Sequence, residues 1–303
     1  MSGVAVADPV EVELDRSEGR RPWRLLLATA WSQHRTKIGV GITLLIVGIA
    51  LIGPFVAPYE PDQGVEGQFP FSPPSSETWF GTDDLGRDVF SRFLAGGVSV
   101  LILAGASTAI GIVLGVAVGL AAAYSRGKLD DVLMRTMDVL LSLPQIVFAL
   151  VLAATVGPEL WLLVLAVGLT TMPRAARVTR GAAVEVVEKD FVRAAEAIGL
   201  PRRRILMGEV LPNIASPLIV ETTLRMTFNV AVVAGLSFLG FGLQPPAADW
   251  GLMINENRNG LTIQPWPVIL PVVAIALLTI GTSLIGDGIS RAAIGIERGR
   301  GRE

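Results

Sequence analysis

Apolar blocks close to the length of a membrane span recur along this 303-residue chain, and they constrain its fold more than any other feature. A helix needs about 20 apolar residues to cross the hydrocarbon core, and a backbone exposed to lipid must satisfy its own hydrogen bonds. Only 17% of the residues are charged, against about 25% in soluble domains. The sequence therefore predicts an all-α polytopic membrane protein with six transmembrane helices, near residues 38–58, 98–123, 137–156, 160–172, 216–240 and 266–285.

The basic residues are segregated, and their distribution predicts an orientation. Of the 25 Lys and Arg residues, all but Arg87, Arg92, Arg225 and Arg258 fall in the two ends of the chain or in the connections on the same side as the N-terminus. Cytoplasmic loops carry the excess of Lys and Arg. Both termini are therefore expected in the cytoplasm, with residues 59–97 outside and a cytoplasmic loop over residues 173–213.

The ends of the chain are predicted to lie outside the spans. Residues 1–21 are polar, and no cleavage site follows a short apolar region, so they indicate a disordered cytoplasmic tail rather than a signal peptide. Residues 22–37 mix Trp and Leu with Arg and Lys, which favours an amphipathic helix at the membrane interface. The transmembrane domain is expected over 38–291, followed by a cytoplasmic tail over 292–303.

Composition excludes several kinds of chemistry. The chain has no cysteine and one histidine, His34, so it offers no thiol site and almost no material for a metal cluster or a catalytic triad. It contains no GxxxxGK[ST] phosphate loop. We therefore expect no enzyme activity, no bound metal and no cofactor in this chain.

The cytoplasmic loop carries a helical pattern of its own, "DFVRAAEAIGLPRRRILMGEVLPN". Asp190 is a suitable N-cap, Gly199 is a typical helix stop and Pro201 suits the start of a following helix. The spacing predicts one apolar face made of Phe191, Ala194, Ala195 and Ile198.

"AAEAIG" followed by Leu211-Pro212 resembles the cytoplasmic-loop signature of ABC importer permeases, with Arg193 where the signature has Glu. In that family the loop is a coupling helix that docks on the ATPase subunit. The resemblance implies an ATPase-coupling role for Asp190, Phe191, Arg193, Ala194, Ala195, Glu196, Ile198, Gly199, Leu211 and Pro212.

Three further stretches resemble the C-type subunits of dipeptide, oligopeptide and nickel importers. They are "GTDDLGRDVFSRFLAGG" (81–97), "DVLLSLPQ" (138–145) and "AGLSFLGFGLQPPAADWGLMI" (234–254). In the first, Thr82 or Asp83 is expected to cap a helix whose apolar stripe is Leu85, Val89 and Phe93. The resemblance runs from about residue 31 to residue 291.

This resemblance implies a type I ABC importer permease fold in the bacterial plasma membrane, and transport of di- or oligopeptides. The expected partners are a homologous permease subunit, two ATPase subunits that bind ATP and Mg, an extracytoplasmic solute-binding protein and the lipid bilayer, with no nucleic acid. A nickel chelate or another small solute is the alternative substrate. An ion- or proton-coupled secondary transporter, or a channel, is the alternative function.

Charged residues inside the predicted spans are candidates for the pathway or a subunit interface. Glu221 and Arg225 are four residues apart on one span, and a lone charge there would be costly, so we expect them to pair or to face a cavity. Asp138 is expected to join two helices, and Pro144 to kink the third span.

Overall fold

The computed structural model describes residues 22–125, 127–157 and 159–300. Its helices are α1 (Pro22–Ser32), α2 (His34–Val56), α3 (Val89–Ala95), α4 (Gly97–Ser125), α5 (Lys128–Ser142), α6 (Gln145–Val156), α7 (Leu160–Val187), α8 (Asp190–Ala197), α9 (Arg202–Ile205), α10 (Leu211–Asn213), α11 (Ala215–Phe238), α12 (Trp250–Asn257) and α13 (Trp266–Arg300). A π-helical turn, Leu206–Val210, precedes α10, and a 3₁₀ turn, Arg258–Gly260, follows α12. The described residues form no β-sheet and only two isolated bridges.

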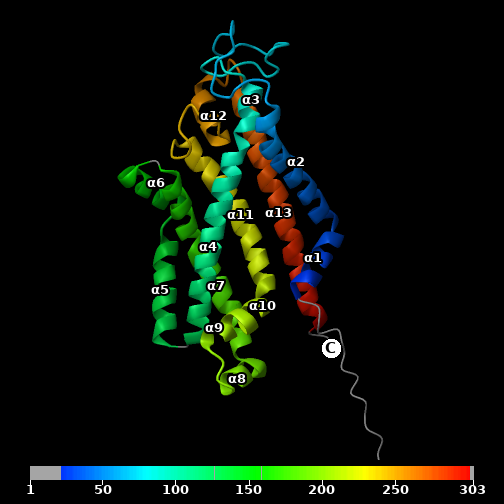
Figure 1. Cartoon of the computed structure of the whole chain (residues 1–303), viewed down its shortest axis with the longest axis vertical. Coiled ribbons are helices and arrows are strands. Elements are labelled where there is room, and N and C mark those ends of the chain that lie inside the picture. Colours follow the sequence, from blue (N-terminus) through cyan, green and yellow to red (C-terminus); the bar gives the residue numbers. More distant parts are fainter. Residues whose placement is uncertain (1–21, 126, 158, 301–303) are drawn as a thin grey trace, which may run out of the picture.

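Five long apolar helical stretches could cross a membrane: α2, α3 with α4, α7, α11 and α13. They run along the long axis of the molecule in Figure 1. The pair α5 and α6 makes a sixth span if its two halves, bent by 84°, cross together. The prediction of a polytopic helical membrane protein is therefore confirmed.

Two predicted proline effects are wrong in detail. The helix of the predicted fourth span does not end at Pro173, because α7 continues through this proline to Val187. Neighbouring helices can compensate for a proline within a membrane helix, and Ala175 and Ala176 keep α7 packed closely on α4. Pro144 marks a break between α5 and α6 rather than a kink within one helix.

The close packing of α4 on α7 depends on glycines four residues apart. A Cβ at Gly115 would lie 2.5 Å from the Cβ of Ala175 and 2.7 Å from the carbonyl oxygen of Met172. Gly111 and Gly119 are equally confined by Thr171 and by the backbone of Ala176. Small residues at this spacing let membrane helices approach closely.

The segment between α2 and α4 corrects another expectation. The helix does not start at Thr82 or Asp83; α3 starts at Val89, and its N-cap is Asp88, which accepts a hydrogen bond from the Ser91 amide at 2.8 Å. Residues 81–88 instead form turns, with positive φ at Gly81 and Gly86. Leu85 is consequently exposed, while Val89 and Phe93 are buried.

Helix α1 packs along the C-terminal half of α13. Leu26 and Ala30 are buried there against Ile289 and Ala292. Whether this helix also touches the membrane interface stays a prediction. The predicted tail 1–21 lies outside the described residues, and residues 292–300 of the predicted C-terminal tail are the end of α13.

Candidate functional site

Helix α8 lies at the end of the bundle opposite α12, as Figure 1 shows. Its buried side consists of Val192 and Ala195, which belong to one apolar cluster with Val187 of α7, Ile205 of α9 and Val210 of the π-helical turn. The short helix is thus held on the bundle by one narrow face.

The other face of α8 is exposed. Phe191 is 40% exposed and Ile198 is 76% exposed, and Arg193, Ala194 and Glu196 are exposed beside them. Ala195, which was expected on this face, is buried at 7% exposure, because its position points the methyl group at the bundle. The candidate contact surface is therefore Phe191, Ala194 and Ile198 without Ala195.

The ends of α8 agree in part with the sequence pattern. Asp190 is the first helical residue, and Lys189 occupies the N-cap position. Gly199 has φ of +77°, which favours glycine and lets the chain reverse into α9. Leu211 and Pro212 lie in α10, where Leu211 packs against the same cluster that holds α8.

A polar cluster occupies the middle of the bundle. Asn229 of α11 donates to the hydroxyl of Thr108 on α4 at 2.9 Å. Its side-chain oxygen accepts from Thr171 of α7 at 3.2 Å and from Gln145, the first residue of α6, at 3.3 Å. The buried amide of Asn229 therefore joins four helices, and its hydrogen bonds offset the cost of burying a polar group among apolar side chains.

A cavity of about 130 Å³ opens beside this cluster. It lies at the α5–α6 break and is lined by Leu140, Leu141, Leu143, Pro144, Gln145, Thr170, Thr171, Arg174, Arg225 and Asn229. Arg225 forms the predicted ion pair with Glu221, with Nε 2.8 Å from Oε1. Asp138 joins α5 to Arg177 of α7, so its expected interhelical role is also confirmed.

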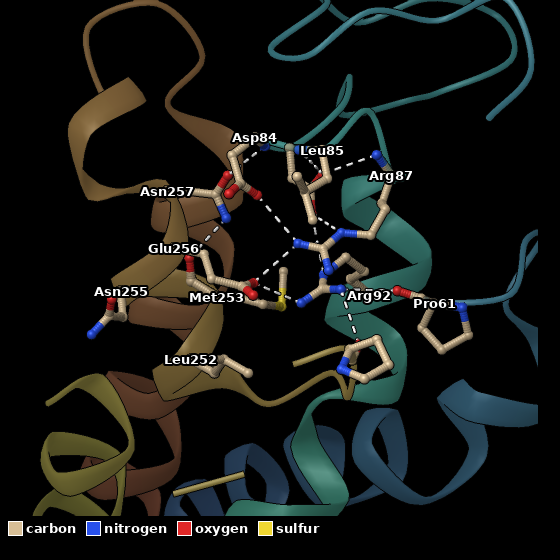
Figure 2. A network of polar contacts seen from close by, with 12 residues as sticks. Pro61, Asp84, Leu85, Arg87, Arg92, Leu252, Met253, Asn255, Glu256 and Asn257 are labelled. Atoms are coloured by element: carbon tan, nitrogen blue, oxygen red, sulfur yellow. Dashed lines mark hydrogen bonds and ion pairs between the residues drawn. The ribbon is translucent and has the colours of Figure 1, made fainter. Parts of the chain in front are cut away.

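An ion-pair network lies at the end of the bundle opposite α8, around α12 (Figure 2). Arg87 contacts Asp83 at 2.7 Å, and Arg92 contacts Asp83 at 3.3 Å and Glu256 at 2.8 Å. Burial raises the pKa of Glu256 and of Asp84, although the arginines oppose the shift. Asp83, Asp84 and Glu256 are close enough to share a cation, but each of them already pairs with Arg87, and Arg92 also pairs with Asp83 and Glu256.

Sequence reasoning missed the polar cluster and the arginines of the network. Asn229, Thr108 and Thr171 are uncharged polar residues within mostly apolar runs, and nothing in their spacing shows that they meet. Arg87 and Arg92 do carry a signal, because they are two of the four basic residues outside the positive-inside pattern.

Comparison with known proteins gives consistent matches. Residues 111–294 match the family described as binding-protein-dependent transport system inner membrane component. The chain is 36% identical over 260 residues to the di/tripeptide transport system permease protein DppC of Pseudomonas aeruginosa, covering 84% of this chain and 86% of that protein. It is 34% identical over 274 residues to the glutathione transport system permease protein GsiD of Pectobacterium atrosepticum, covering 90% and 91%. A solved structure titled as inward-facing conformations of the MetNI methionine ABC transporter is 20% identical to this chain. The match covers 63% of this chain and 93% of that chain with a TM-score of 0.47, and it supports no further conclusion.

Proposed function

We propose a transport function from one premise: this chain belongs to the family of binding-protein-dependent transport system inner membrane components. The proposed function is that of the permease subunit of an ATP-driven importer for short peptides. The observation that carries it is the similarity, over most of the chain, to permeases named for di/tripeptides and for glutathione. Glutathione is itself a tripeptide, so both names point to the same class of substrate.

The proposed topology has six spans and both termini in the cytoplasm. In it, α5 and α6 are one broken span whose two halves are bent by 84°. The distribution of Lys and Arg supports this orientation, because it places the basic connections and both ends of the chain on one side. The α12 end then faces outward and α8 faces the cytoplasm, in a type I importer arrangement.

In this proposal α8 transmits force from a separate ATPase. The sequence has no phosphate-binding loop, so ATP and Mg belong to partner subunits. Phe191 of α8 and Ile198 at its C-cap expose large apolar side chains three and four residues from Ala194, and contiguous exposed apolar patches often mark protein-binding surfaces. Small Ala194 between them allows a docking surface to approach closely.

The remaining partners follow from the same arrangement. A homologous permease would cover the apolar faces that the single chain leaves open, including Val139, Val147 and Val151 of α5 and α6. A solute-binding protein would dock at the α12 end. ATP binding and hydrolysis would then switch the two permeases between outward- and inward-open states, and this chain would perform no bond chemistry.

The test is transport by the assembled complex in proteoliposomes with its solute-binding protein. We expect accumulation of a labelled di- or tripeptide with ATP and none with ADP. Uptake driven by a proton or sodium gradient without ATP would instead identify a secondary transporter. Uptake of a nickel chelate, with no peptide transported, would show that the substrate is the nickel chelate and not a peptide.

A further inference from the structure

The cavity at the α5–α6 break carries a net positive charge. Arg174 and Arg225 both line it, and Glu221 neutralises only Arg225. Asp138, the nearest acid on α5, is already paired with Arg177. Among the described residues Arg174 has no ion-pair partner, so one cationic charge at this cavity is left without a counter-ion.

This charge lies far from both ends of the helices. Arg174 is about 21 Å along α7 from Leu160, and Arg225 is about 15 Å along α11 from Ala215, at a rise of about 1.5 Å per residue. Arg174 is exposed, and arginines within the helices of a membrane bundle commonly face water or a partner and mark substrate pathways. The guanidinium of Arg174 is therefore open to a ligand at the cavity, and its charge favours an anion.

The cavity's size and its lining restrict that anion. A cavity of about 130 Å³ holds a few waters and suits one end group of a larger molecule. Gln145, Thr170 and Thr171 add neutral polar groups to its wall. A planar guanidinium binds a carboxylate through two parallel hydrogen bonds, which matches one end group of a larger molecule.

We propose that this cavity is a subsite for the free carboxylate of the transported peptide, with Arg174 as its ligand. The proposal rests on the peptide-transport function proposed above. Peptides of different sequence share their backbone and termini, so a permease that accepts many of them can bind a terminus. The Glu221–Arg225 pair leaves the site with a single excess charge, which favours binding that is weak enough to allow release.

The experiment compares a free-acid dipeptide with its C-terminal amide. Initial rates of ATP-dependent uptake are measured in proteoliposomes at equal loading of the solute-binding protein, with the loading determined separately by titration. The variants are Arg174→Gln and Arg174→Lys. The matched control is the double variant Arg177→Gln with Asp138→Asn, because it removes a neighbouring pair of opposite charges together and neither residue lines the cavity.

We expect the wild type to transport the acid about tenfold faster than the amide, because losing one hydrogen bond to a charged group weakens binding by about that factor. Arg174→Gln should slow the acid about tenfold, leave the amide unchanged and bring the ratio close to one. Arg174→Lys should give an intermediate ratio because lysine keeps the charge without the planar fork. The Arg177→Gln, Asp138→Asn double variant should leave the ratio as in the wild type.

The possible failures can be told apart. An unchanged ratio in Arg174→Gln, or equal slowing of both substrates, would overturn the carboxylate subsite while leaving peptide transport intact. If Arg174→Gln fails to assemble with the ATPase, Arg174→Lys decides, and a wild-type ratio in that variant contradicts the proposal. Absence of ATP-dependent peptide uptake in the wild type would overturn the proposed function itself.

Discussion

Arg92 of α3 and Glu256 of α12 are 164 positions apart in the sequence, and their side chains form an ion pair at 2.8 Å. Arg92 is fully buried and also donates to the carbonyl oxygen of Pro61 at 3.0 Å. One guanidinium therefore joins α3 to the segment after α2 and to α12, as Figure 2 shows. The α12 end of the bundle is fixed by charge pairing as well as by apolar packing.

Replacement of Arg92 should destabilise this end of the protein. Arg92→Met leaves Asp83 and Glu256 buried with Arg87 as their remaining cation, and breaking a buried pair typically costs about 3 kcal/mol or more. Adding Glu256→Gln should cost much less than the two single changes summed. Thermal unfolding of the purified complex measures both, and Arg258→Met, at an exposed residue, is the control. Full additivity would show that the pair is not coupled.

The contact of α4 with α7 should not tolerate a side chain at Gly115. A Cβ there would clash with Ala175 and with the backbone of Met172, so Gly115→Ala should force the helices apart and reduce the yield of assembled protein. Gly105→Ala is the matched control on the same helix, because a Cβ at Gly105 has no atom within 4 Å. Equal yields for the two variants would contradict the close packing described here.

Local rules predicted much of the bundle but failed where distant segments meet. The apolar runs located α4, α11 and the start of α13 to within a few residues, because hydrophobic length is a property of each segment alone. Pro173 misled the prediction for α7, since packing against α4 outweighs the local cost of a proline. The helix expected at Thr82 is absent for a related reason: Asp83 is used as the buried partner of Arg87 and Arg92.

The same contrast holds for the candidate site. The Glu221–Arg225 pair was predictable, because four-residue spacing places two side chains on one face of a helix. The cavity was not predictable, since the sequence analysis placed Arg174 beyond the fourth span and the neighbours of Arg174 come from three other helices.

Breaking the Glu221–Arg225 pair on one side should be worse than removing both charges. Glu221→Gln leaves Arg225 beside Arg174 without its counter-ion, whereas Glu221→Gln with Arg225→Met removes the charges together. We expect the single variant to give the lower amount of assembled complex, measured by co-purification of the ATPase. Equal losses in the single and double variants would show that the pairing does not set the cost.

Two neighbouring alanines on α8 allow its docking surface and its packing on the bundle to be tested separately. Ala194 is exposed and Ala195 is buried, so the same change to arginine has different consequences at the two positions. Ala194→Arg should leave the stability of the permease within about 0.5 kcal/mol of the wild type, as is usual for surface changes. It should nevertheless abolish peptide uptake, because a long charged side chain would occupy the surface on which we expect the ATPase to dock.

Ala195→Arg should destabilise the permease itself, because it places a charge in the apolar cluster with Val192 and Ile205 and displaces α8 from the bundle. We expect it to lower the thermal stability of the permease before any partner binds. Unfolding of the isolated chain, ATPase co-purification and uptake are measured for both variants. Normal uptake and co-purification in Ala194→Arg would mean that the exposed face of α8 is an ordinary solvated surface, whatever the fate of Ala195→Arg.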